Sequence, residues 1–222
     1  MDTLSDIWGV LANNTDLFRT GFFNTIKLFV IAAIGSLALG TFLAMLRVSP
    51  VPILRAVGTA YVTLLRNTPL TLVLFFFAFA YPLLDIVRVS FFASASIGLT
   101  LYTAAFVCEV VRSGINTVNV GQAEAARALG LTFGQTLGQI VLPQAIRSVV
   151  PPLTSVQIAL LKNTTIAAGF SVAEAGAIRD NLSERGENIM IGLGWVALGF
   201  LILVIPLTLL QRSLERRWSV AR

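Results

Sequence analysis

The 222-residue sequence contains no histidine and only one cysteine, and charged side chains make up 12% of it. The lack of histidine excludes metal sites and proton relays built on imidazole. The single Cys108 lies in an apolar run and cannot form a disulfide within the chain. These absences leave no nucleophile–base or metal constellation for an intramembrane enzyme. The P-loop pattern GxxxxGK[ST] is also absent, so we expect no ATP hydrolysis by this chain.

Apolar residues are abundant instead: 56% of the chain is hydrophobic, and the mean hydropathy is +0.83. Soluble domains average well below these values, so the composition predicts an integral membrane protein. About 20 apolar residues cross a bilayer as a helix. Five segments meet this length, at residues 22–46, 56–84, 92–115, 145–170 and 189–210. We therefore expect an all-α membrane protein with five transmembrane helices in a single domain over residues 1–222.

The arginines indicate the orientation in the membrane. An odd number of spans places the two termini on opposite sides. Arg212, Arg216, Arg217 and Arg222 lie in the C-terminal tail, and further arginines lie in or beside the loop at 119–143. Because cytoplasmic loops carry an excess of Lys and Arg, we expect this loop and the C-terminus in the cytoplasm and the N-terminus outside.

A small-residue spacing occurs in the first predicted span. Ala32, Ser36 and Gly40 recur every four residues, which allows a neighbouring helix to approach closely. Both packing within the chain and packing against another subunit are consistent with this spacing.

The stretch GQAEAARALGLTFGQTLGQIVLPQAI is too polar to span a membrane. Residues 122–129 are strong helix formers, and Glu124 stands in the first turn, where the helix dipole favours an anion. Gly130 is typical of a helix end, and a second helical stretch over 133–142 leads to Pro143. This helix–Gly–helix hairpin fits either a rigid docking knob or an amphipathic connector at the membrane surface.

The spacing of Glu124, Ala125, Ala126, Gly130 and the Ile-x-Leu-Pro at 140–143 resembles the EAA motif of the membrane subunits of binding-protein-dependent ABC importers. In that family this loop forms the coupling helices that dock on the cytoplasmic ATPase. The resemblance therefore implies a coupling role for Glu124, Ala125, Ala126, Arg127 and Gly130.

Further stretches resemble the permeases of polar amino-acid importers, the histidine/glutamine/arginine/glutamate group. They are YTAAFVCEVVRSGI, RNTPL and LKNTT, and RVSPV, GTAY and KNTTIA are most similar to glutamate-uptake permeases. The resemblance implies the type I ABC importer permease fold in a bacterial cytoplasmic membrane. It also implies a second permease subunit, two ATPase subunits that bind ATP and magnesium, and an extracytoplasmic binding protein. It implies no cofactor in this chain and no nucleic acid partner.

Ionisable groups within the predicted spans are costly and should have a partner or a function. Glu109 and Arg112 share a helix face, and Arg66 stands shortly before Pro69, which biases Thr68 away from helical geometry. We expect an intramembrane ion pair between Arg66 and Glu109 with Arg112 nearby. A structural clamp and a gating element both remain open.

Two polar segments are candidates for the translocation path: Arg66, Asn67 and Thr68, and Lys162, Asn163 and Thr164. A cation beside amide and hydroxyl groups suits the carboxylates of an amino acid, although interhelical hydrogen bonding is an alternative for the second segment. Three cations, Arg66, Arg112 and Lys162, are expected near the path, together with one acid, Glu109. This excess of positive charge favours an anionic amino acid as the substrate, glutamate above all. A secondary transporter or channel that acts without an ATPase is the alternative function, and dependence on ATP separates the two.

Overall fold

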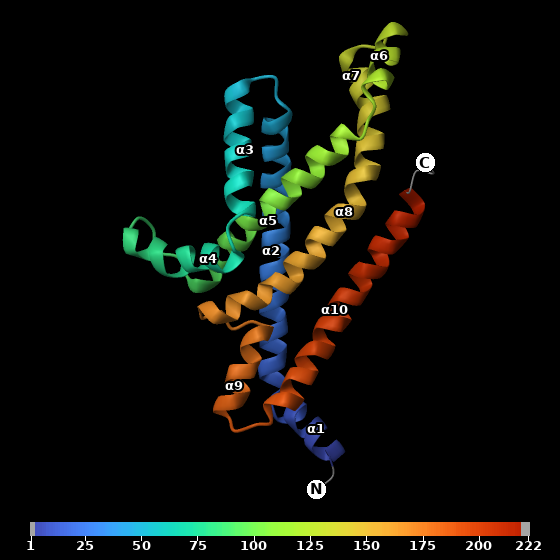
Figure 1. Cartoon of the computed structure of the whole chain (residues 1–222). Coiled ribbons are helices and arrows are strands. Elements are labelled where there is room, and N and C mark those ends of the chain that lie inside the picture. The colour runs from blue at the N-terminus through green and yellow to red at the C-terminus, as the bar shows by residue number, and fades with distance from the viewer. Residues whose placement is uncertain (1–2, 219–222) are drawn as a thin grey trace.

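The computed structural model describes residues 3–218, and every regular element in that range is helical (Figure 1). The short helix α1 (Thr3–Asn13) leads into α2 (Thr15–Val48), which runs along the middle of the molecule. The helices α2, α5 (Phe91–Asn116) and α10 (Ile189–Trp218) are each long and apolar enough to cross a membrane. The remaining segments are shorter, broken or more polar.

The second predicted span, residues 56–84, is not one continuous helix, because the chain breaks beside Pro69. Helix α3 (Pro52–Arg66) and the helical segment Leu70–Leu84 meet at 101°. That second segment consists of α4 (Leu70–Phe75), a π-helical turn (Phe76–Ala80) and a 3₁₀ turn (Tyr81–Leu84). Pro69 lacks an N–H and restricts the residue before it, so the helix cannot continue through this position. If the bent pair counts as one span, four candidate spans are present among the described residues.

The core forms where α2 crosses α5. Ala32 and Ser36 are fully buried. At Gly40 an added Cβ would lie 2.6 Å from Val107 of α5 and 2.7 Å from the Ala104 carbonyl oxygen. Contacts this short require glycine, so the small-residue stripe predicted on α2 packs within the chain, where it brings the two helices together.

Helix α8 (Leu142–Asn163) continues as a 3₁₀ turn (Thr164–Phe170), and together they cover the fourth predicted span. By length and composition α8 is not among the candidate spans, although it has 22 residues. Leu160 of α8, Phe170 of the 3₁₀ turn and Leu70 and Leu74 of α4 belong to one buried cluster with α2 and α5. The ends of two interrupted helices therefore meet at the same place in the core.

Different short helices lie at the two ends of the molecule (Figure 1). The short helices α6 (Val120–Ala128) and α7 (Phe133–Thr136) lie at the end toward which the C-terminus points. Helix α9 (Ile178–Glu184), preceded by a 3₁₀ turn at Ala175–Ala177, lies with α1 at the opposite end. The N-terminus is therefore far from the α6–α7 hairpin, and the C-terminus is on the same side as the hairpin.

Candidate functional site

The α6–α7 hairpin is built by local signals in the sequence. The Asn119 side chain accepts a hydrogen bond from the Gly121 N–H at 2.8 Å and begins α6. At the other end Gly130 has a φ of +85°, and its N–H donates to the Arg127 carbonyl at 2.9 Å while the Leu131 N–H donates to the Ala126 carbonyl at 3.1 Å. This pair of bonds is the Schellman motif, which turns the chain sharply at a left-handed glycine.

The second half of the hairpin begins with a capping box. Thr132 accepts a hydrogen bond from the Gln135 N–H, and the Gln135 side chain accepts one from the Thr132 N–H. From Phe133 the chain stays helical through a π-helical turn (Leu137–Val141) into α8, with Pro143 in the first turn of that helix. Pro143 has no N–H to donate to the preceding turn, and the helix is irregular, a π-helical turn, directly before it. The hairpin is thus joined directly to α8.

Large apolar side chains protrude from this hairpin. Leu129 is 82% exposed and Phe133 is 77% exposed, one on each side of Gly130. Glu124, Ala125 and Arg127 are exposed as well, whereas Ala126 is buried. Beside them lies an apolar groove of about 340 Å³ between α6 and the segment leading to α8. Exposed apolar side chains around a groove are typical of a surface that another protein covers.

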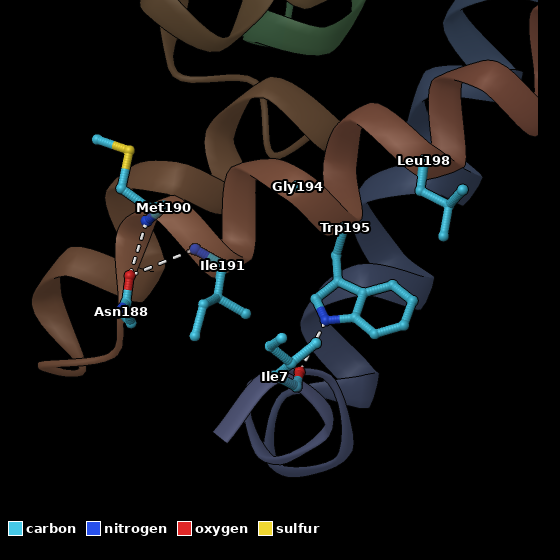
Figure 2. Close-up of a pocket in the computed structure, with 7 residues that line it drawn as sticks. All are labelled: Ile7, Asn188, Met190, Ile191, Gly194, Trp195 and Leu198. Carbon is cyan, nitrogen blue, oxygen red and sulfur yellow. Dashed lines mark hydrogen bonds between the residues drawn. The ribbon is translucent and has the colours of Figure 1, made fainter. Parts of the chain in front are cut away.

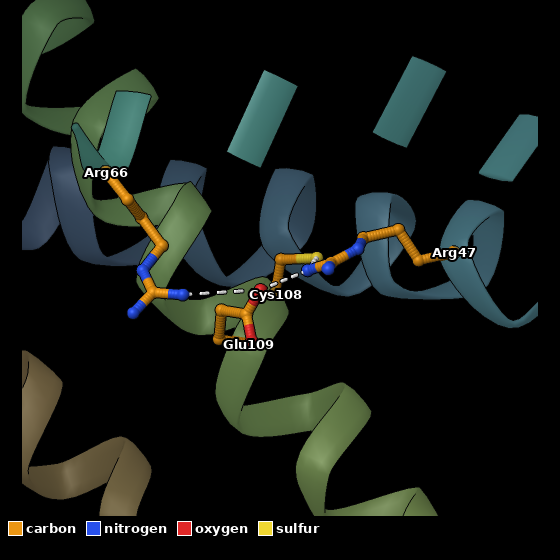
Figure 3. A network of polar contacts seen from close by, with 4 residues as sticks. All are labelled: Arg47, Arg66, Cys108 and Glu109. Carbon is orange, nitrogen blue, oxygen red and sulfur yellow. Dashed lines mark hydrogen bonds and ion pairs between the residues drawn. The ribbon is translucent and has the colours of Figure 1, made fainter. Parts of the chain in front are cut away.

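A charged cluster lies between α2, α3 and α5 (Figure 3). Arg47 of α2 forms an ion pair with Glu109 of α5, and Arg66 Nη1 lies 3.5 Å from the same carboxylate oxygen, Glu109 Oε1. The side chain of Arg47 is only 9% exposed, whereas that of Arg66 is 48% exposed. The guanidinium of Arg66 also stands over the Phe106 ring, 5.9 Å from its centroid. Glu109 is therefore held by two arginines in different environments.

Arg47 was not predicted as a partner of Glu109, and Arg112, three residues from Glu109 on α5, interacts with it electrostatically without forming an ion pair. Arg112 forms none of the ion pairs found among residues 3–218. Gly58 of α3 makes room for Arg47, since an added Cβ would lie 2.7 Å from Arg47 Cγ. Arg47 is the last cation before the α2–α3 turn, and arginines beside such turns commonly set the orientation of a protein in the membrane. The sequence therefore contained no sign of its contact with Glu109.

The two predicted path segments lie at helix interruptions. Asn67 ends α3, and the Thr68 hydroxyl donates to the Leu64 carbonyl at 2.8 Å. Lys162 is exposed near the end of α8. Thr164 is fully buried, and its hydroxyl donates to the Leu161 carbonyl at 2.7 Å. Thr164 thus stabilises the change from α-helix to 3₁₀ helix. Asn163 is half-buried beside it.

A buried carboxylate that was not predicted from the sequence lies at the opposite end of the molecule. Glu174 is 1% exposed. It accepts hydrogen bonds from the Thr25 hydroxyl at 3.0 Å and from the Gly176 N–H at 2.7 Å. Burial raises the pKa of Glu174 to about 7, and these hydrogen bonds oppose the rise in part. Because Thr25 is 149 residues away in the sequence, no local pattern marks this contact.

This chain is similar in sequence to known membrane transport proteins. Residues 36–220 match the family described as the inner membrane component of binding-protein-dependent transport systems. The glutamate transport system permease protein GluC of Corynebacterium glutamicum is 42% identical over 99% of this chain and 100% of its own length. The probable glutamine ABC transporter permease protein GlnM of Bacillus subtilis is 38% identical over 94% of this chain and 96% of its own length.

A solved structure agrees with the same assignment. A crystal structure of an amino acid ABC transporter with histidines has a TM-score of 0.88 at 26% identity, and the match covers 98% of this chain and 99% of that one. The fold is therefore that of an importer permease over nearly the whole chain. From its sequence match and its fold together, this chain belongs to the inner membrane components of binding-protein-dependent transport systems.

Proposed function

We propose that this chain is the permease subunit of an ATP-driven importer of polar amino acids and that glutamate is its cargo. The observation that carries the proposal is the α6–α7 hairpin, which exposes Leu129 and Phe133 around a left-handed Gly130. A rigid apolar knob of this kind suits insertion into a cleft of an ATPase subunit. Glu124, Ala125 and Arg127 would contribute the polar edge of that contact.

The proposed complex contains two permeases, two ATPase subunits and an extracytoplasmic amino-acid-binding protein. ATP and magnesium would bind to the ATPase subunits, and the permease itself would need no cofactor. In this proposal the chain crosses the membrane five times, with the bent pair as the second span and α8 as the fourth. The arginines near the C-terminus favour a cytoplasmic hairpin and C-terminus and an external N-terminus.

The substrate path is proposed along the interrupted helices. Broken membrane helices expose backbone groups and line binding sites in transporters. Arg66 and Asn67 lie at one interruption and Lys162 and Asn163 at the other, and the two interruptions pack on one core cluster. The cations favour a substrate with a second carboxylate. The glutamate permease among the relatives supports the same substrate.

The experiment is uptake by proteoliposomes that contain the whole complex, with ATP enclosed and the binding protein outside. We expect labelled glutamate to enter only with ATP and the ATPase, and unlabelled glutamate to compete far better than arginine. Lys162→Glu should lower uptake without loss of complex assembly.

Uptake by the permease alone under an ion gradient would establish the alternative, a secondary transporter or channel. If uptake needs ATP but arginine competes better than glutamate, the importer stands and the substrate assignment fails.

A further inference from the structure

The last turns of α10 carry arginines around a pocket. Arg212, Arg216 and Arg217 line a pocket of about 360 Å³ together with Ser213 and Leu209. Arg212 and Arg216 are four residues apart, and Leu209, Ser213 and Arg217 form the adjacent row with the same spacing. Residues spaced in this way share one face of a helix. All five are exposed, so this face is open to the surroundings of the chain.

The opposite face of the same turns holds α10 against α8. Gln211 Nε2 lies 2.8 Å from Ser155 Oγ of α8 and 2.8 Å from Glu215 Oε1. At 3.6 residues per turn, Gln211 lies across the helix from the centre of the arginine pocket. Glu215 lies toward the Gln211 side, and none of the five residues that line the pocket is acidic. The arginine side therefore faces away from α8.

An apolar stripe leads along α10 to this pocket. Ile202, Ile205 and Leu209 are 64%, 50% and 58% exposed and lie on the same face as Arg212. At about 1.5 Å per residue, the stripe from Ile202 to Arg212 is about 15 Å long. This is half of a hydrocarbon core about 30 Å thick, the depth of one leaflet.

The first turns of α10, in contrast to the apolar stripe, pack against α1 (Figure 2). Trp195 and Leu198 line an apolar pocket of about 460 Å³ with Ile7 of α1. The Trp195 indole N–H donates to the Ile7 carbonyl at 2.9 Å. This contact with α1 lies at the beginning of α10, and the stripe from Ile202 onward keeps half or more of its surface exposed.

We propose that this face of α10 binds an anionic phospholipid, with the phosphate in the arginine pocket and an acyl chain along Ile202, Ile205 and Leu209. Guanidinium groups bind phosphate oxygens through paired hydrogen bonds. Arg212 and Arg216 stand one helical turn apart, so a single phosphate can reach both guanidinium groups. A second copy of this chain on the same face would bring two arginine clusters together, so charge complementarity favours the lipid.

The test measures lipid binding to the full-length permease, purified with its partner subunits, by native mass spectrometry. The probes are phosphatidylglycerol and phosphatidylcholine with the same acyl chains. Each arginine near an anionic lipid contributes about 1 kcal/mol, a factor of about five. The double variant Arg212→Gln/Arg216→Gln should therefore bind phosphatidylglycerol about 30-fold more weakly, while phosphatidylcholine binding stays weak and unchanged.

The matched control is Arg55→Gln/Arg147→Gln, which removes the same charge from two exposed arginines outside the pocket. This control should still bind phosphatidylglycerol. Ile205→Asp, which interrupts the apolar stripe, should lose phosphatidylglycerol binding. Equal loss in the control, or equal binding of both lipids, would overturn the proposal. So would inorganic phosphate that binds as tightly as the lipid. Disulfide formation between Ile205→Cys copies in native membranes would show a protein interface instead and would also overturn it.

Discussion

At the scale of single residues, burial separates charged groups that look alike in the sequence. Arg47 and Arg66 both contact Glu109, but Arg47 is 9% exposed and Arg66 is 48% exposed. A nearly buried cation that loses its partner stays uncompensated, whereas a half-exposed one is screened by its surroundings. The two arginines should therefore contribute very differently to stability.

We expect Arg47→Gln to destabilise the permease by about 3 kcal/mol or more, as for loss of one partner of a buried pair. Arg66→Gln should cost less than about 1 kcal/mol. Thermal unfolding of both variants in the same detergent measures the difference. Exchange of the charges, Arg66→Glu with Glu109→Arg, should not restore stability, because the new arginine would face Arg47. Recovery in the exchanged double variant would contradict the assignment of Arg47 as the main partner.

Glu174 gives a second prediction, for the dependence of stability on pH. Its pKa is about 7 in the folded protein against an ordinary value of 4.5. The folded state then holds the proton more tightly, so the free energy of unfolding falls as pH rises from about 4.5 to 7 and levels off above. The loss is at most about 3 kcal/mol.

Thermal unfolding between pH 5 and 8 measures this fall. Glu174→Gln keeps the shape of the side chain without the charge, so it should flatten the profile in this range. Glu184 is exposed on α9, and Glu184→Gln is the control that should leave the profile unchanged. An unchanged slope in Glu174→Gln would assign the effect to another group.

At the scale of elements, glycines with similar surroundings have different roles in the hairpin. Neither Gly130 nor Gly134 has an atom within 4 Å of an added Cβ, but only Gly130 has a positive φ, +85°. A side chain at position 130 would therefore strain the backbone but would not clash with any neighbouring atom. The proposed docking function of the hairpin can therefore be tested through its shape while its surface is nearly unchanged.

Gly130→Ala should weaken docking of the ATPase about 5- to 30-fold, since a left-handed alanine costs roughly 1–2 kcal/mol. Gly134→Ala should behave like the unchanged protein. Co-purification of the ATPase and ATP-driven uptake measure both steps. If the two variants behave alike, the shape of the Gly130 turn does not control docking.

At the scale of the whole molecule, the arrangement of the ends predicts which segments face each compartment. The α6–α7 hairpin and the C-terminus lie at one end, and α1 and α9 at the other (Figure 1). Cys108 is fully buried, so single introduced cysteines can report on either end with little background.

In a Cys108→Ala background, an impermeant thiol reagent applied to intact cells should label Ser183→Cys, on α9, and leave Gln139→Cys unlabelled. Both positions are exposed in the structure. Labelling of Gln139→Cys after the cells are opened is the control for reactivity. The reverse pattern would place the hairpin outside and exclude docking to a cytoplasmic ATPase.

The sequence by itself determined the features that depend on neighbours along the chain. Its composition established the membrane class, and Asn119, Gly130 and Thr132 produce the caps and the turn of the hairpin through bonds that span five residues or fewer. Pro69 marked the break in the second span, because proline cannot donate the helical hydrogen bond. These are local effects, which need no tertiary contact.

Only the tertiary structure decided the 101° angle between α3 and the segment that follows it, and the partners of the buried charges. Arg47 and Glu109 are 62 residues apart, and Thr25 and Glu174 are 149 residues apart. Whether such side chains meet depends on how each helix is rotated and how closely it packs. Gly40 of α2 against Val107 of α5, and Gly58 of α3 against Arg47, set how closely these helices approach one another.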